Sequence, residues 1–362
     1  MKSSKYCFLF FYLVFFCSIS FSQWSQVGQL PNLGFARISV VDSNVIWATG
    51  DFTATPVLYR SVDGGVNWTS IPTQGLPFFL TCLAAKDSLT AFVADVGSNN
   101  YAGGNAKLFK TIDAGQNWIL IDSTGGTLGF FDDIVFSKSN PQFGLALSDP
   151  PDGAGNPFYL FITTNEGVDW TLTTPPGVIE SFGLLNAAFA IDEQFYGFQL
   201  ININTNTADS YITSDGGTNW YTGGETMPLI NYGSGEDIVF NDDKLTGIMI
   251  SIDYLPNIKR TTDGGVNWET VNTLSDISGS CNASWVSGTN IVFICAQNSG
   301  SNKNILRSDD GGSTWVSQNT APVNNIMEID NIRYADIIIA YSVSSSGKIL
   351  KSRQTIQSVG VQ

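Results

Sequence analysis

One eight-residue pattern recurs six times along the chain and constrains its fold more than any other feature. The copies occupy residues 61–68, 111–118, 163–170, 213–220, 261–268 and 308–315. The tryptophans that close successive copies lie 50, 52, 50, 48 and 47 residues apart. This period is too long for repeats of two helices and suits one four-stranded sheet per repeat. The pattern therefore predicts an all-β chain that folds as a β-propeller of four-stranded antiparallel blades.

Each copy has the composition of a tight turn. The aspartate can accept backbone N–H groups, the glycine pair can adopt positive φ, and the leading Ser or Thr hydroxyl can hold the start of the turn. The second copy has Ala114 at the first glycine position, and the third has Asn165 in place of the aspartate, with Asp169 near its end. We therefore assign a structural role, and no catalytic one, to Asp63, Trp68, Asp113, Trp118, Asn165, Trp170, Asp215, Trp220, Asp263, Trp268, Asp310 and Trp315.

The segments outside the copies set the number of blades. Three strands are expected before the first copy, at 36–41, 45–50 and 57–61, and three after the last copy, at 329–335, 337–343 and 348–352. Trp24 begins a short segment that lies 44 residues before Trp68, close to one period. A six-bladed ring would leave a set of strands unpaired. We therefore expect seven blades, the last closed by an N-terminal strand beside 348–352, because closure removes exposed sheet edges.

The N-terminus has the pattern of a secretory signal peptide. Lys2 and Lys5 precede an apolar run at 7–16, and small residues follow at 18–22. An uncleaved anchor would need about 20 apolar residues, which is longer than this run. We expect a signal at 1–22, a propeller at 23–353 and a polar tail at 354–362, in an exported protein that is periplasmic, cell-surface or secreted, with no membrane span after the signal.

Charge and composition exclude several classes of function. The chain has 17 Lys and Arg against 32 Asp and Glu and no basic cluster, so we expect no nucleic-acid partner. It has no histidine, which excludes a Ser-His-Asp hydrolase and a metal site built on histidine. Loops at 95–106, 149–159 and 199–210 carry oxygen ligands suited to Ca²⁺ but without regular spacing. We assign no metal and no cofactor, and we expect a monomer.

Three cysteines remain after removal of the signal. They are Cys82, Cys281 and Cys295, an odd number that cannot form a disulfide framework. Cys281 and Cys295 flank an expected hairpin and would bridge in an oxidising compartment only if their register allowed it. The alternative is three buried thiols, and the sequence leaves both open.

The recurring pattern resembles the Asp-box, Ser/Thr-x-Asp-x-Gly-x-Thr/Asn-Trp, of BNR-repeat propellers. These include sialidases, xyloglucanase-like glycosidases, sortilin-type receptors and the Ycf48 class of assembly factors. The resemblance implies that each box lies on the turn between the third and fourth strands of a blade, away from the usual binding face. It also implies a basic groove in a Ycf48-like protein, which this acidic chain lacks. The signal and tail resemble those of exported Bacteroidetes proteins.

The opposite face, formed by connections between blades, carries the candidate binding residues. Aromatic residues and carboxylates recur there, and 132–136 is nearly repeated at 236–240. The candidates are Arg37, Asp132, Asp133, Glu180, Tyr232, Glu236, Asp237 and Asp330. We favour a scaffold that binds a protein or glycan on this face. The alternative is a glycoside hydrolase with a carboxylate pair. A sialidase is disfavoured, because three arginines precede boxes and only Arg37, Arg333 and Arg353 remain.

Overall fold

The computed structural model describes residues 23–356, apart from 32–33, 35, 51–56, 77–78, 98–102, 179–180, 203, 223–226, 229–236, 252–256, 272–276, 299–302, 319, 321–322 and 324–325. Regular structure in this part of the chain consists of 29 strands and no helix. Accordingly, none of the described residues form a helix of the length and hydropathy needed to cross a membrane.

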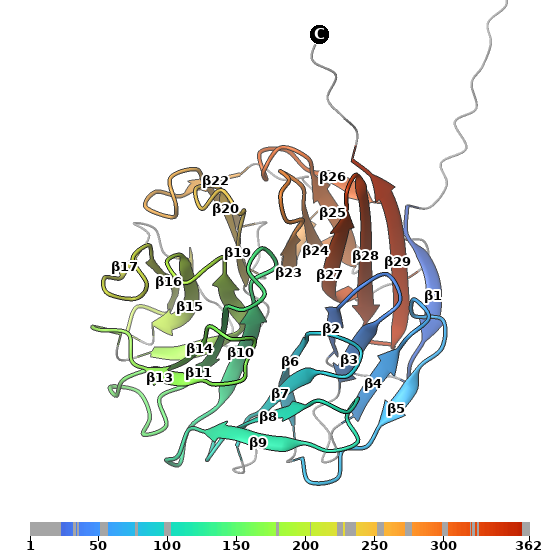
Figure 1. Cartoon of the computed structure of the whole chain (residues 1–362). Helices are drawn as coiled ribbons and strands as arrows, with labels where there is room; N and C mark the ends of the chain where they lie inside the picture. The colour runs from blue at the N-terminus through green and yellow to red at the C-terminus, as the bar shows by residue number, and fades with distance from the viewer. Residues whose placement is uncertain are drawn as a thin grey trace, which may run out of the picture.

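Seven antiparallel sheets are arranged radially around a central axis, as Figure 1 shows. Blade 1 contains β2 (Ala36–Val40), β3 (Ile46–Gly50), β4 (Val57–Ser61) and β5 (Thr69–Ile71); blade 2 contains β6 (Leu80–Ala85), β7 (Ala91–Asp95), β8 (Lys107–Thr111) and β9 (Ile119–Ser123); blade 3 contains β10 (Phe131–Phe136), β11 (Gly144–Ser148), β12 (Tyr159–Thr163) and β13 (Thr171–Thr173).

The remaining blades repeat this order. Blade 4 contains β14 (Ser181–Ala190), β15 (Tyr196–Asn202), β16 (Thr207–Thr213) and β17 (Tyr221–Thr222), with β18 (Met227–Pro228) also paired to β16; blade 5 contains β19 (Asp237–Phe240), β20 (Gly247–Ser251), β21 (Asn257–Thr261) and β22 (Glu269–Thr270); blade 6 contains β23 (Ile277–Trp285), β24 (Val292–Asn298), β25 (Lys303–Ser308) and β26 (Val316–Gln318); blade 7 contains β27 (Ile326–Tyr334), β28 (Ile337–Ser344), β29 (Lys348–Thr355) and β1 (Ser25–Gln29).

Blade 7 joins the two ends of the chain and closes the ring. Its strand order is β1-β29-β28-β27, so the N-terminal strand takes the outermost place beside β29. Trp24 is fully buried and packs edge-on against Phe293 of blade 6, with ring centroids 6.0 Å apart. The predicted seven blades and their closure by the N-terminal strand are confirmed.

The six repeated turns join the third and fourth strands of blades 1 to 6, and their hydrogen bonds explain their composition. In the first, Ser61 Oγ donates to Asp63 Oδ1 at 2.9 Å, and Asp63 Oδ1 accepts from Asn67 N at 2.8 Å. The third turn reverses donor and acceptor: Asn165 Nδ2 donates to Asp169 Oδ2 at 2.9 Å. The Asn-for-Asp exchange is therefore compensated within the same turn.

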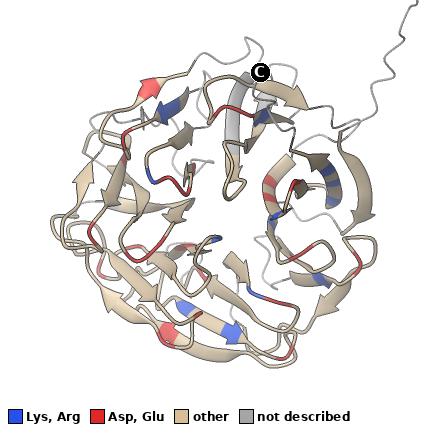
Figure 2. Ribbon diagram, turned by 45° about the horizontal axis from the view of Figure 1, so that its top comes forward, with Lys and Arg blue, Asp and Glu red and all other residues tan. Residues whose placement is uncertain are grey.

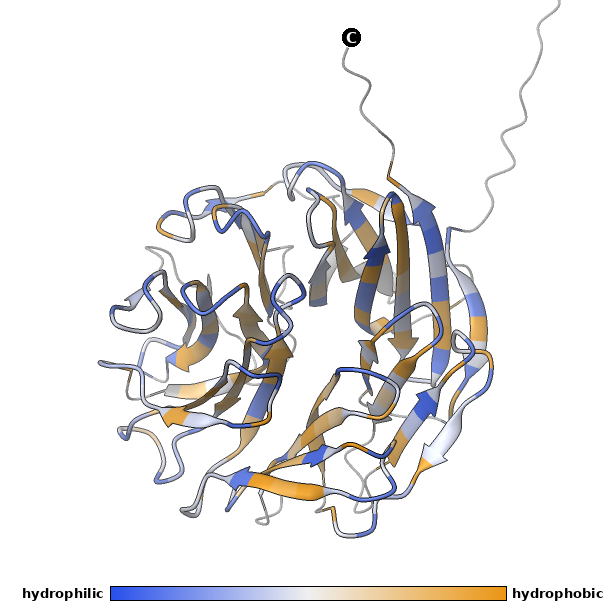
Figure 3. Cartoon of the chain, in the orientation of Figure 1, coloured by the Kyte–Doolittle hydropathy of each residue, from blue (hydrophilic) through white to orange (hydrophobic). Residues whose placement is uncertain are grey.

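The hydrophobic core is divided into seven clusters, one at each junction between neighbouring blades. Apolar residues accordingly follow the strands, whereas the turns are hydrophilic (Figure 3). The repeat tryptophans pack toward the preceding blade. Trp268 of blade 5, for example, belongs to the cluster between blades 4 and 5 and contacts Phe240 at a centroid distance of 5.8 Å.

The cysteines contribute to this core. The Cys82 thiol is buried and lies 3.5 Å from Phe131 O of the next blade, and Cys295 is also buried. Strand β23 has an irregularity between Ser280 and Asn282, so Asn282, and not Cys281, pairs with Cys295. The side chain of Cys281 lies outside the described residues, so the choice between a bridge and three buried thiols stays open.

Candidate functional site

The first strand of every blade faces the axis of the ring, and these inner strands surround a cavity of about 670 Å³. All seven blades contribute residues to its lining. Aromatic side chains in the wall are Phe136, Phe189, Phe240 and Trp285. The cavity therefore combines an apolar wall with polar groups from the inner strands, which is the usual composition of a ligand pocket.

The cavity lies at the end of the ring that carries the repeated turns. Its lining includes Lys138, Ser287 and Ala335, which belong to turns between the first and second strands of their blades. Each repeated turn donates a backbone hydrogen bond to this same turn of its own blade, as Gly64 N does to Asn44 O at 2.9 Å. This cavity is thus on the face opposite to the one that we expected to bind a partner.

The predicted site residues divide into two groups. Glu180, Tyr232 and Glu236 lie outside the described residues. The other five lie on the inner strands β2, β10, β19 and β27: Arg37, Asp132, Asp133, Asp237 and Asp330. Arg37 and Asp132 are each 2% exposed and Asp237 is 3% exposed, so these residues are buried in the ring and not displayed on a loop.

The acidic residues of the inner strands link each blade to the next. Asp133 Oδ2 accepts from Ala188 N of blade 4 at 3.1 Å. In blade 5, Asp237 Oδ2 accepts from Ala283 N of blade 6 at 2.8 Å. One oxygen of each carboxyl is therefore committed to a backbone N–H that has no strand partner on that side.

Other polar residues on inner strands make the same kind of link. Ser39 Oγ accepts from Ala85 N at 3.0 Å, Thr81 Oγ1 donates to Phe131 O at 2.7 Å, and Asn282 Oδ1 accepts from Ile329 N at 2.8 Å. Blade 7 is linked to blade 1 by Asp330 Oδ2, which accepts from Val40 N at 2.8 Å. Within the described part of the chain, six of the seven junctions have such a link, and the junction of blades 4 and 5 has none.

Sequence reasoning missed Ser39, Thr81 and Asn282, because small polar residues in a strand carry no functional signature. A usable signal exists for Asn282. It takes the place in blade 6 that Asp133 has in blade 3 and Asp237 has in blade 5, so an alignment of the repeats to one another would have shown this recurrent polar position. Ser39 and Thr81 lie at other levels of their strands.

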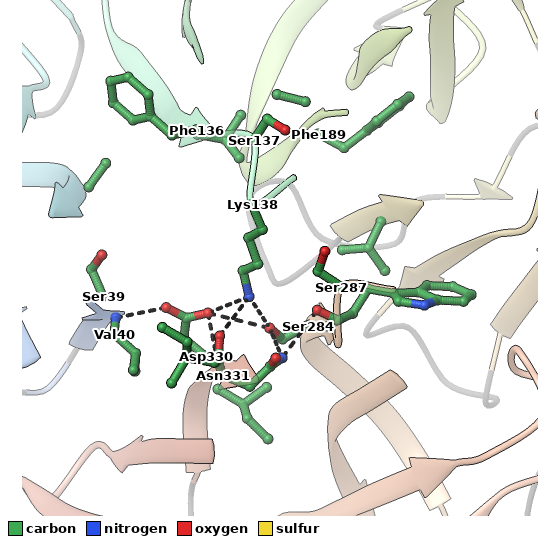
Figure 4. Close-up of a pocket in the computed structure, with 18 of the residues that line it drawn as sticks. Ser39, Val40, Phe136, Ser137, Lys138, Phe189, Ser284, Ser287, Asp330 and Asn331 are labelled. Carbon is green, nitrogen blue, oxygen red and sulfur yellow. Dashed lines mark hydrogen bonds and ion pairs between the residues drawn. The ribbon is translucent and has the colours of Figure 1, made fainter. Parts of the chain in front are cut away.

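Lys138 spans the cavity. It follows β10 of blade 3, and its Nζ lies 2.7 Å from Asp330 Oδ1 of blade 7 and 3.2 Å from Ser284 Oγ of blade 6, as Figure 4 shows. It also donates to Asn331 O at 3.2 Å. Basic residues are otherwise scattered around the ring among acidic ones (Figure 2), so no basic groove forms in the described part of the chain.

Burial shifts the pKa values of the carboxyls around the axis upward. It raises the pKa of Asp133 to about 6 and that of Glu328 to about 8, with Arg37 opposing both shifts. Burial also raises the pKa of Asp237 and of Asp132 well above the usual range, and the neighbouring Asp149 adds to the shift at Asp132. Burial therefore favours the protonated form of each of these carboxyls up to a higher pH than in a solvent-exposed carboxyl.

The described residues contain no group of three or more His, Cys, Asp or Glu side chains arranged to hold a metal ion. One of the loops rich in oxygen ligands, 149–159, begins with Asp149, whose Oδ1 instead accepts a hydrogen bond from Gly183 N of blade 4. The carboxyls of the inner strands thus serve as hydrogen-bond acceptors between blades.

Comparison with known proteins supports the fold. No family model and no curated protein matches the chain. Among solved structures, YCF48 bound to D1 peptide matches 95% of this chain and 98% of its own, with a TM-score of 0.56 and 16% identity. YCF48 from Cyanidioschyzon merolae matches 91% of this chain and 98% of its own, with a TM-score of 0.55 and 15% identity.

A third solved structure, an ancestral GH74 enzyme, covers 89% of this chain and 36% of its own, with a TM-score of 0.42 and 12% identity. This likeness is too distant to support a functional comparison. The strand order and the two YCF48 structures together show a seven-bladed β-propeller, and at these identities the shared architecture does not determine its ligand.

Proposed function

We propose that the chain is an exported scaffold protein that binds a protein or glycan partner in the central cavity. The cavity supports this proposal, because its volume of about 670 Å³ lies within the range of about 300–1,000 Å³ typical of ligand pockets. Its acidic residues already accept backbone hydrogen bonds from neighbouring blades, which favours binding over catalysis.

A segment of another protein is the preferred partner. Phe136, Phe189 and Trp285 offer apolar contact, and Lys138 places a cation across the cavity. YCF48, which has the same architecture, has been observed with a bound peptide.

Export is proposed from residues 1–22 alone. Mass spectrometry of the protein from its native cells is expected to find Gln23 at the N-terminus, and an intact Met1 would refute cleavage.

The binding test uses Lys138→Ala in residues 23–362. The matched control is Lys244→Ala, because Lys244 forms a comparable ion pair with Asp192 away from the cavity and its side chain is 39% exposed against 40% for Lys138. Peptide and glycan arrays are probed with both variants and the unmodified chain. We expect Lys138→Ala to change binding and Lys244→Ala to leave it unchanged. Equal effects of the two variants on binding would rule out the cavity as the binding site.

A glycoside hydrolase is the second candidate. The observation in its favour is the raised pKa of Glu328, about 8, beside Asp133 in the same cavity, because a protonated carboxyl is what a glycosidase uses to protonate the leaving oxygen. A panel of chromogenic glycosides tests it, with Asp133→Asn, Asp237→Asn and Glu328→Gln as variants. If the unmodified chain hydrolyses a glycoside and any of these substitutions abolishes the hydrolysis, the chain is a glycosidase and the scaffold proposal is wrong.

A further inference from the structure

Two polar side chains are buried in blade 4 without any hydrogen-bond partner. Gln199 is 0% exposed and Ser210 is 1% exposed, and they lie directly opposite one another on β15 and β16. Neither Nε2 nor Oε1 of Gln199 has a partner, nor does Oγ of Ser210. A buried polar group without a hydrogen bond keeps the full cost of its lost hydration, so three such atoms side by side require an explanation.

The other blades show that this polar pair is not a general feature of the repeat. The residue three positions before each repeated turn is Leu58, Leu108, Leu160, Ile258 or Ile305 in the other five copies, and Ser210 in blade 4. Their partners in register are Thr49, Ala94, Leu147, Ile250 and Cys295, and in blade 4 the partner is Gln199. Thr49 is the other amide- or hydroxyl-bearing residue of the set, and its Oγ1 donates to Val57 O at 2.8 Å.

The inner strand of blade 4, β14, is irregular directly opposite Gln199. Gly183 pairs with Leu200, and the next pair is Ala188 with Phe198, so residues 184–187 lie opposite Gln199 alone. Asn186, within this bulge, has φ of 63° and lines the central cavity. Bulges and left-handed residues other than glycine cluster at binding sites, because they redirect backbone groups that would otherwise complete the ladder.

The surroundings of Gln199 and Ser210 are apolar and uncharged. Neighbouring residues on the same face, Leu184, Ala187 and Ala208, belong to the core cluster between blades 4 and 5. This is also the junction without a polar link between inner strands. The buried residues of that cluster are apolar and offer an ion no counter-charge, whereas a neutral molecule that donates and accepts would satisfy the amide and the hydroxyl together.

We propose that Gln199 and Ser210 hold one internal water molecule between β15, β16 and the bulge of β14. The water accepts from Gln199 Nε2 and donates to Ser210 Oγ or Gln199 Oε1, which gives it the two to four polar partners that buried waters have. It lies behind the part of the cavity wall that contains Asn186, beside a polar pair whose positions hold two aliphatic residues in blades 2, 3 and 5.

A crystal structure of residues 23–362 at a resolution that shows ordered water tests the proposal. We expect one water within hydrogen-bond distance of both Gln199 and Ser210. A direct hydrogen bond between the two side chains, an empty space, or a side chain of segment 223–236 in this place would overturn the proposal.

Magnetic relaxation dispersion of water provides a second measurement in solution, because it counts long-lived internal waters. The double variant Gln199→Leu/Ser210→Leu copies the pair Leu147 and Leu160 of blade 3, and we expect it to lose one long-lived water. Thr49→Val is the matched control at the equivalent position of blade 1 and is expected to lose none. An equal count in the double variant and the unmodified chain would refute the site. If the double variant does not fold, Gln199→Leu is measured in its place; it leaves Ser210 Oγ as the remaining polar partner of the pair, so an unchanged count there has the same meaning.

Discussion

The pH dependence of stability can be tested at a single inner-strand carboxyl, Asp133. Its Oδ2 accepts a hydrogen bond from Ala188 N at 3.1 Å, and burial raises its pKa from 3.8 to about 6, with Arg37 opposing the shift. The substitution Asp133→Asn retains an oxygen for this bond and removes the titrating proton. The variant therefore isolates the free energy of ionising one carboxyl inside the ring.

The sign follows from the direction of the shift. As the pH rises from 3.8 toward about 6, the unfolded chain releases the proton before the folded chain does, so the free energy of unfolding decreases; above that range the loss is complete. A shift of about two units corresponds to about 3 kcal/mol at 1.36 kcal/mol per unit. Because Asp133 is partly exposed to the cavity, solvent screening reduces this to about 1–3 kcal/mol.

Urea unfolding of both proteins at pH 4 and pH 7.5 measures the effect. The other carboxyls titrate in both proteins, so the difference between the two reports Asp133. We expect equal stability at pH 4 and an Asn variant that is more stable at pH 7.5. Asp133→Ala, which also removes the acceptor for Ala188 N, is expected to lower stability at both pH values. An Asn variant less stable than the unmodified chain at pH 7.5 would show that the charged form stabilises the ring and would refute the reasoning.

Three further predictions concern stability. Ala114→Gly is expected to stabilise the chain by about 1 kcal/mol, because Ala114 has φ of 64°; an unchanged or lower denaturation midpoint would contradict this. Trp268→Ala is expected to cost about 3–5 kcal/mol in chemical denaturation and to leave partner binding by the folded fraction intact, because Trp268 is 5% exposed and lies outside the cavity. Deletion of residues 23–29 is expected to lower the melting temperature strongly, since it exposes β29 and removes the buried Trp24; an unchanged value would argue against closure by β1.

The architecture was predictable from the sequence because six of the blades repeat the same local turn sequence. The predicted strand 57–61 is observed as β4 (Val57–Ser61), and the predicted 348–352 is observed within β29 (Lys348–Thr355). Glycine pairs and a tryptophan at a fixed period determine the turns locally, so no long-range information was needed to place them.

The site was less predictable because its contacts join different blades. The paired acids at 132–133 suggested a displayed carboxylate face, but the structure turns Asp133 toward the backbone of blade 4 and buries Asp132. The position of the cavity depends on the tilt and spacing of seven strands, which no single repeat encodes. The bulge opposite Gln199 also depends on a register that only the pairing of β14 with β15 reveals.

A second set of contacts explains why the described residues form no basic groove. On the second and third strands of several blades an aromatic residue lies opposite a cation, as with Trp47 and Arg60 in blade 1. The charged groups lie over the rings: Arg60 is 5.6 Å from the centroid of Trp47, and Lys110 is 5.1 Å from that of Phe92. Such stacking fixes a flexible cation in one position.

The fixed cations then reach the following blade. Lys110 Nζ donates to Gly167 O of blade 3 at 3.0 Å, and Lys351 Nζ of blade 7 donates to Ser43 O of blade 1 at 3.3 Å. Arg260 Nε donates to Gly311 O of blade 6 at 2.7 Å. These cations lie at different junctions around the ring, at the end that carries the repeated turns, and each is committed to a carbonyl of the following blade, so they do not line a continuous groove. The same contacts that hold neighbouring blades together therefore keep these cations apart from one another.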